Sequence, residues 1–252
     1  MYYNSISVRV TRKKTAPRKG ATCGPPIWDR IGAPPSSAVA RIVRAATKLA
    51  DRDGVEKISM RSLASQLGSG VMSLYHYVPS KADLLDLLLE AAMGGVALPG
   101  RPSGDWRADL NTVGAEMRAC LKRHPWLIGL LHSRPAFGPN RLAQFEFSLA
   151  AVAGLGLDIE TMHRMVSSLY IYTMGFVMLE LSEAEALRRA RHGRCKALPP
   201  YIRRLISTGA FPNIECLFRE SDGPPASDAA FKDGLDLVLD GMAALLKTAA
   251  RK

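Results

Sequence analysis

Residues 42–90 read IVRAATKLADRDGVEKISMRSLASQLGSGVMSLYHYVPSKADLLDLLLE, and this stretch decides the fold. Residues 61–68 show one short helical pattern and residues 71–78 show a second, with Gly68-Ser69-Gly70 between them. Two short helices joined by a glycine turn have the layout of a helix-turn-helix. A helical hairpin with a polar face would show the same local pattern, so the flanking residues must distinguish the two structures.

The two short helices each have an inner, apolar face. It comprises Leu63, Ala64 and Leu67 in the first helix and Val71, Leu74 and Val78 in the second. Gly68 supplies the left-handed backbone that a tight helix exit needs. The outer side of the second helix carries Met72, Ser73, Tyr75, His76 and Tyr77. Hydroxyl and aromatic groups of this kind suit phosphates and base edges.

The flanks favour the DNA-binding interpretation. An upstream helix capped at Ser36 or Ser37 has an apolar stripe of Val39, Ile42, Val43, Ala46, Leu49 and Ala50. Ser59 is placed to cap the helix that carries Arg61. Downstream, Ser80 and Asp83 resemble a capping box, and Lys81 lies at a helix N-terminus where a phosphate can bind.

The patterns AA..LA...G...IS.R.LA..LG and SLYHYVPSKADLLD together resemble the N-terminal domain of the tetracycline-repressor (TetR) family of transcriptional regulators. The resemblance implies an all-α protein. A three-helix DNA-binding domain would be joined through a fourth helix to a larger helical domain for ligand binding and dimerisation. By residues, we expect a basic, mostly disordered arm at 1–35, the DNA-binding domain at 36–93, and the second domain at 94–252.

The family also implies roles for individual residues. Arg61 matches a position that reaches a base, Ser73 and Tyr75 match positions at the groove, and Tyr77 and Lys81 match phosphate-contacting positions. Gly70, Val71 and Met72 fall where the family varies its readout. With His76 from the outer face, the predicted DNA-binding residues are Arg61, Gly70, Val71, Met72, Ser73, Tyr75, His76, Tyr77 and Lys81.

The charge of the chain agrees with a polyanionic partner. Its 252 residues carry a net charge of +11, although many basic proteins bind no nucleic acid. Residues 1–35 hold seven basic residues and one acidic residue, which is +6 of the total. This arm could track phosphates or the minor groove, could be an inert tail, or could result from a wrongly assigned translation start.

Other sequence signals narrow the location and chemistry. Cys23, Cys120, Cys195 and Cys216 form no CxxC pair, which predicts neither a zinc site nor a disulfide framework. A secretory signal would need an apolar core of about 7–15 residues, and a membrane span would need about 18, and neither is present. We expect a soluble cytoplasmic protein with no metal and no cofactor. No catalytic motif indicates an enzyme.

Glycines and prolines between residues 94 and 104 mark the predicted domain boundary, and helices dominate after it. Helices are expected over 105–123, from 124, over 137–155, over 159–190 and over 228–249, with one short helix near 201–207 in a loop-rich segment. The 159–190 helix is apolar on most of its circumference, so it must be buried on more than one side. In the family, this helix and the last one form a homodimer interface, and Gly241 would permit close helix approach. An internal bundle core is the alternative.

The second domain resembles that of the tetracycline repressor at Trp106, at His124-Pro125-Trp126 and at FKDGLDLVLDGMAAL. The resemblance implies a mostly apolar pocket for a small-molecule effector. Candidate lining residues are Met117, Leu121, Trp126, Leu130, Phe145, Tyr170, Met174 and Met178. Ordinary core packing is the commoner role of such side chains, because aromatic and methionine residues fill cores whether or not a ligand binds. His124, His132 and His163 are candidate polar anchors.

The sequence therefore predicts a homodimeric repressor that binds a double-stranded operator and is released by a small-molecule effector. The alternative is a basic architectural protein that coats DNA without sequence preference. A large apolar domain would be superfluous for mere coating, which favours the repressor.

Overall fold

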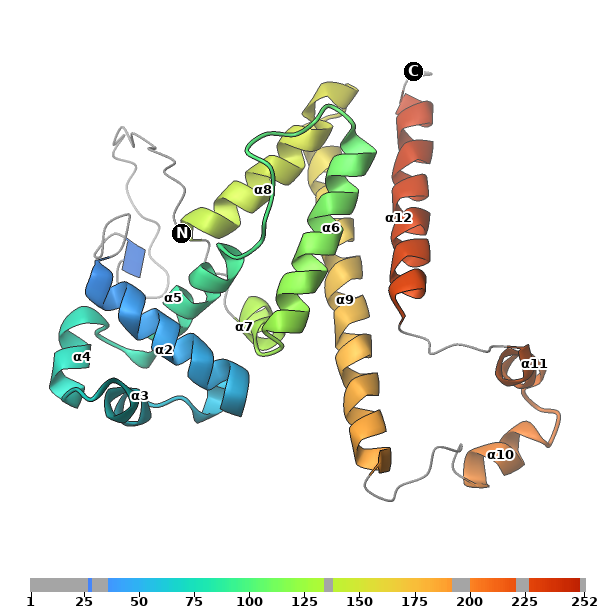
Figure 1. Cartoon of the computed structure of the whole chain (residues 1–252). Coiled ribbons are helices and arrows are strands. Elements are labelled where there is room, and N and C mark those ends of the chain that lie inside the picture. The colour runs from blue at the N-terminus through green and yellow to red at the C-terminus, as the bar shows by residue number, and fades with distance from the viewer. Residues whose placement is uncertain (1–26, 29–35, 134–137, 192–199, 221–226, 250–252) are drawn as a thin grey trace, which may run out of the picture. The chain divides into compact units, whose positions relative to one another are not determined.

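The computed structural model describes residues 27–28, 36–133, 138–191, 200–220 and 227–249 (Figure 1). These residues are helical and contain no strand, which confirms the predicted all-α class. They fall into two compact units, residues 1–151 and residues 152–252. The predicted arm at 1–35 lies outside the described residues except for Ile27 and Trp28, of which Ile27 is buried.

The first unit contains α2 (Ser37–Asp53), η1 (Val55–Lys57), α3 (Met60–Leu67), α4 (Val71–Tyr77), α5 (Lys81–Met93), α6 (Trp106–Arg123), α7 (Leu127–Ser133) and α8 (Pro139–Val152). We call residues 36–93 the reader. Within it, α2 contacts η1, α3, α4 and α5, so this helix is the scaffold of the others (Figure 1).

The apolar stripe of α2 explains why the reader folds. All six predicted stripe residues are buried on α2, at 8% exposure or less: Val39, Ile42, Val43, Ala46, Leu49 and Ala50. The helix begins where Ser36 Oγ accepts the Val39 N–H at 3.4 Å, and it ends at Gly54, where φ is +88°. Burying this stripe against short helices supplies stability that those helices lack alone.

The second unit contains η2 (Ala153–Leu155), α9 (Ile159–Arg191), α10 (Pro200–Ile206), α11 (Pro212–Glu220) and α12 (Asp228–Ala249). Helices α9 and α12 lie side by side. The Tyr172 hydroxyl donates to the Phe231 carbonyl at 2.7 Å, and the two rings stack with centroids 5.6 Å apart. Contrary to the expectation that no segment is apolar enough over about 18 residues, residues 159–188 are, by length and composition only, long and apolar enough to cross a membrane.

Two details differ from expectation. The segment after α9 contains a second short helix, α11, whose first residue is Pro212, a residue that presets the backbone angle of a first helical turn. Close approach between α9 and α12 occurs at Gly234, where a Cβ atom would collide with Tyr172. At Gly241 a Cβ would meet nothing within 4 Å in the single chain, so the close approach expected there in a dimer stays a prediction.

Candidate nucleic-acid interface

A reciprocal capping box starts α3 and positions Arg61. Ser62 N–H donates to Ser59 Oγ, and Ser59 N–H donates to Ser62 Oγ, each at 3.0 Å. Two otherwise unpaired backbone donors are thereby satisfied at the helix start. Arg61 follows Met60 in the first turn and is exposed, so its guanidinium is available to an anionic partner.

The turn between α3 and α4 depends on a glycine in the left-handed region. Gly68 has φ +60° and ψ +33°, as its position predicted. In this conformation Gly68 N–H donates to Ser65 O at 3.2 Å and Ser69 N–H donates to Ala64 O at 3.0 Å, which closes α3. Gly70 has an extended backbone at φ −71° and begins α4.

Helix α4 divides into an inner and an outer side. Leu74 and Val78 are 3% and 0% exposed, whereas Met72 is 79%, Tyr75 40% and Tyr77 41% exposed. Ser73 and His76 are also exposed, and Val71 is half-buried. Helix α4 has only seven residues, so it is stable because its inner side packs against neighbouring helices. Its outer side can then present hydroxyl and aromatic groups to a DNA groove.

The start of α5 adds a cation beside the N-terminus of a helix that Ser80 caps. Ser80 Oγ accepts the Asp83 N–H at 3.0 Å and donates to the Asp83 carboxylate at 2.7 Å. Lys81 is exposed, and its Nζ donates to the Glu56 carbonyl at 3.4 Å. The ammonium group is therefore held loosely at the N-terminus of α5, where the helix dipole also favours an anion.

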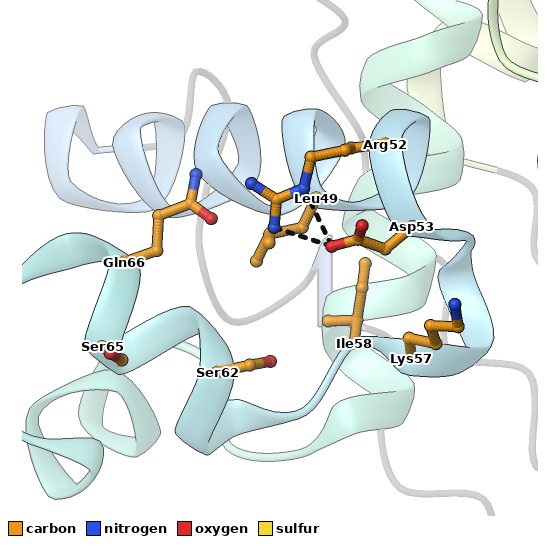
Figure 2. A pocket seen from close by; sticks show the side chains of 8 residues that line it. All are labelled: Leu49, Arg52, Asp53, Lys57, Ile58, Ser62, Ser65 and Gln66. Carbon is orange, nitrogen blue, oxygen red and sulfur yellow. Dashed lines mark hydrogen bonds and ion pairs between the residues drawn. The ribbon is translucent and has the colours of Figure 1, made fainter.

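A shallow hollow of about 310 Å³ lies on the reader between the end of α2 and α3 (Figure 2). It is lined by Leu49, Arg52, Asp53, Lys57, Ile58, Ser62, Ser65 and Gln66. Arg52 lies across it and donates to Asp53 Oδ2 from Nη2 at 2.7 Å and from Nε at 3.0 Å. That bond lowers the pKa of the exposed Asp53 carboxyl and raises the pKa of Arg52.

Sequence reasoning missed a polar cluster at the other side of the same helix end. Asp51 Oδ1, in the last turn of α2, lies 2.7 Å from His124 Nδ1 and 2.7 Å from Trp126 Nε1. A carboxylate only accepts, so His124 Nδ1 carries a proton in this contact. We call these three residues the Asp51 clamp. Trp126, predicted as a pocket residue, thus has its indole N–H committed to Asp51, and it is 8% exposed.

The end of α5 is held by a second set of polar contacts, from α8. The Asn140 backbone N–H donates to Glu90 Oε1, and the Asn140 side chain donates to the Glu90 carbonyl at 3.1 Å. Gln144 donates to the Met93 carbonyl. Glu90 is 2% exposed, and burial raises the pKa of its carboxyl, opposed by the backbone donors of Asn140 and Arg141.

The predicted effector-lining residues divide between the two units. Met117, Leu121, Trp126 and Leu130 are buried in the first unit, where Phe145 is half-buried. Tyr170 and Met174 are half-buried on α9 of the second unit, and Met178 is 55% exposed there. Of the predicted polar anchors, His124 belongs to the Asp51 clamp, while His132 and His163 are exposed.

The Cys120 thiol, near the end of α6, is not a reactive group. Cys120 Sγ donates to the Ala92 carbonyl at 3.3 Å, and burial raises the pKa of its thiol to about 11, so it is protonated at neutral pH. Among the residues that the structure describes, no group of three His, Cys, Asp or Glu side chains could hold a metal ion.

Short helices α3 and α4, joined by a left-handed glycine and supported by α2, define a helix-turn-helix DNA-binding protein. Two family models match the chain: "Bacterial regulatory proteins, tetR family" over residues 42–88 and "Tetracyclin repressor-like, C-terminal domain" over residues 98–246. The chain belongs to the TetR family of transcriptional regulators, which bind DNA and are released from it by small-molecule ligands.

Individual relatives agree. The HTH-type transcriptional repressor DrrR1 of Streptomyces coeruleorubidus is 33% identical, with 87% of this chain and 84% of DrrR1 covered. A tetracycline repressor of class A from Escherichia coli is 27% identical over 80% of this chain and 88% of its own length. The crystal structure of ActR from Streptomyces coelicolor in complex with actinorhodin superimposes with a TM-score of 0.66 at 27% identity, covering 85% of this chain and 99% of ActR.

Proposed function

We propose that the outer side of α4 reads an operator in the major groove, with Ser73, Tyr75 and Met72 nearest the base edges. The observation that carries this proposal is the exposure of Met72, Tyr75 and Tyr77 on a helix whose Leu74 is buried, as is Val78 directly after it. Gly70, Val71 and His76 complete the surface of that helix. Residues 36–93 serve as the DNA-binding domain and 94–252 as the effector and dimerisation domain.

Exposed cations around α4 bind the phosphates. Arg61 precedes the turn, Lys81 follows α4, and Arg41 and Arg44 are exposed on α2. Each phosphate that a cation neutralises releases counterions, so the affinity should fall steeply as the salt concentration rises.

The protein acts as a homodimer through α9 and α12. Both helices expose large apolar side chains: Ile171, Leu179, Leu187, Leu237 and Leu245 are 44–74% exposed. A second copy of this pair would bury them in a four-helix interface, which also accounts for the apolar length of α9 without a membrane. Two readers would then occupy successive major grooves of an inverted repeat, roughly 34 Å apart.

The effector is a small apolar or aromatic molecule whose contacts come from among the candidate residues. The side chains named above are mostly aliphatic, aromatic or thioether groups, which suit such a ligand. Actinorhodin and tetracycline, the molecules named with the relatives, are suitable first probes. Binding that favours a reader spacing unsuited to the operator releases the DNA without any catalytic step. A regulator of this kind works in the cytoplasm.

Selection of binding sites from random duplex DNA at near-physiological salt tests this function. We expect enrichment of an inverted repeat that binds two chains. Recovery of no preferred sequence, with binding that disappears as salt rises, would instead support the architectural alternative.

A further inference from the structure

The Asp51 clamp joins the scaffold helix of the reader to the corner between α6 and α7. Asp51 comes from α2, which contacts α3, α4 and α5. Both donors come from residues 73 and 75 positions later in the chain. A displacement of this contact would therefore move α2 and, with it, the helix that we place in the groove.

The geometry of the clamp is restrictive. One carboxylate oxygen, Oδ1, receives both donors at 2.7 Å, which is the short range of charge-assisted hydrogen bonds. The side chains of His124 and Asp51 are 13% and 36% exposed, and Trp126 is 8% exposed. A buried indole N–H without an acceptor is costly, so Trp126 strongly favours the position in which Asp51 reaches it.

The corner that supplies the donors is itself well supported. His124 ends α6, with its N–H donating to Cys120 O at 2.9 Å, and its carbonyl accepts the Leu127 N–H at 2.9 Å. Its ring lies 5.5 Å from the Trp126 ring between centroids. Leu127 and Leu130 of α7 are 0% and 5% exposed, and α7 packs on α5 of the reader.

We propose that Asp51 is a positioning residue: through His124 and Trp126 it fixes the placement of the reader on α6 and thereby the spacing between operator half-sites that the dimer accepts. The inference rests on the proposed function, because spacing has meaning only for a dimer on an inverted repeat. Met117 and Leu121, two candidate effector contacts, lie on α6 within two turns of His124. Movement of α6 on effector binding would thus reach the reader through this carboxylate.

The test compares three duplexes: the selected inverted repeat, the same repeat with one base pair added between its halves, and a single half-site. Dissociation constants are measured by fluorescence anisotropy. Asp51→Ala should accept the lengthened repeat more readily than wild type does. The ratio of Kd on the lengthened repeat to Kd on the selected repeat should therefore fall by about fivefold or more, which is the smallest change in affinity that is typical of coupling between two sites. The Kd on the single half-site should stay at the wild-type value, because the surface of α4 is untouched.

Asp53→Ala is the matched control. Asp53 lies two residues away at the same helix end and pairs with Arg52 within the reader, so its loss should leave the ratio unchanged. Trp126→Phe keeps a six-membered aromatic ring and removes the N–H, and it should lower the ratio as Asp51→Ala does. Asp51→Asn retains one acceptor oxygen and should fall between wild type and alanine.

Three outcomes would overturn the proposal. The first is a wild-type ratio in both Asp51→Ala and Trp126→Phe. The second is an equal loss of affinity on the single half-site, which would indicate damage to the reader instead of its placement. The third is the absence of any inverted repeat for the wild-type protein, which would overturn the proposed function together with this inference.

Discussion

Leu74 and Tyr75 are neighbours on α4 with opposite environments. Leu74 is 3% exposed and Tyr75 is 40% exposed. We expect Leu74→Ala to lower the free energy of unfolding by about 2–5 kcal/mol through a lost core contact. Tyr75→Ala should leave stability within about 0.5 kcal/mol of wild type and weaken operator binding by about 1–3 kcal/mol.

Urea unfolding and anisotropy titrations separate these two effects. Tyr75→Phe serves as the control, since it keeps the ring and removes only the hydroxyl. If operator affinity survived both Leu74→Ala and Tyr75→Ala, the assignment of α4 as the recognition helix would be wrong.

Glu90 gives a residue-level prediction about pH. Burial raises the pKa of its carboxyl in the folded protein above the ordinary value of 4.5. Between the unfolded and folded pKa values, the folded state therefore binds more protons than the unfolded state, and stability falls as the pH rises through this window.

Glu90→Gln removes this titration. We expect wild type to lose stability relative to Glu90→Gln as the pH rises from about 4.5 through the folded pKa, with a constant difference above it. Free energies of unfolding from urea titrations at several pH values measure the difference. Parallel stability curves for the two proteins would contradict the prediction.

At the scale of the helices, the turn between α3 and α4 depends on Gly68 and tolerates substitution of Gly70. Gly68→Ala meets no atom within 4 Å, so its cost is purely conformational, about 1–2 kcal/mol for a left-handed alanine. Gly70 has φ −71°, and a Cβ there would contact only Ser73 Oγ at 3.9 Å. Gly70 is the N-cap of α4, where alanine is a poorer cap than glycine, so this loss opposes the entropic gain and Gly70→Ala should stay within about 1 kcal/mol of wild-type stability.

Thermal and urea unfolding measure this contrast. Equal destabilisation by both substitutions would show that the strain argument is wrong. A further readout is DNA binding, which Gly70→Ala should alter because Gly70 begins the recognition helix.

The sequence predicted the reader well because its determinants are local. Gly68 at the turn, Ser59 at a helix start and the α2 stripe act within one or two helical turns, and all three are confirmed. Contacts between distant residues left no such signal. The Asp51 clamp joins residues that are 73 and 75 positions apart in the sequence. The close contact of Gly234 is with Tyr172, which belongs to another helix, so the sequence around Gly234 did not indicate it.

At the scale of the whole molecule, the exposed apolar side chains of α9 and α12 predict that a charged residue placed there will weaken the dimer. Ile171 and Leu237 are 72% and 74% exposed. Aspartate at either position should raise the dimer dissociation constant by about 30-fold or more, equivalent to losing an interface contact of about 2 kcal/mol. Sedimentation velocity measures the change.

Leu142→Asp is the control for that experiment, since Leu142 is 52% exposed on α8. It should leave the dimer intact. A dimer unaffected by aspartate at both Ile171 and Leu237 would exclude this surface as the interface.

Because Asp51 accepts hydrogen bonds from both His124 and Trp126, the clamp limits which DNA-binding domains can be joined to this effector domain. A chimera that grafts a foreign reader onto this effector domain would bring its own residue to the position of Asp51. Unless that residue presents an acceptor oxygen at the same place, the Trp126 N–H of the host would lose its acceptor at the junction. Biosensors built by exchanging readers should therefore carry Asp51, His124 and Trp126 across as one unit.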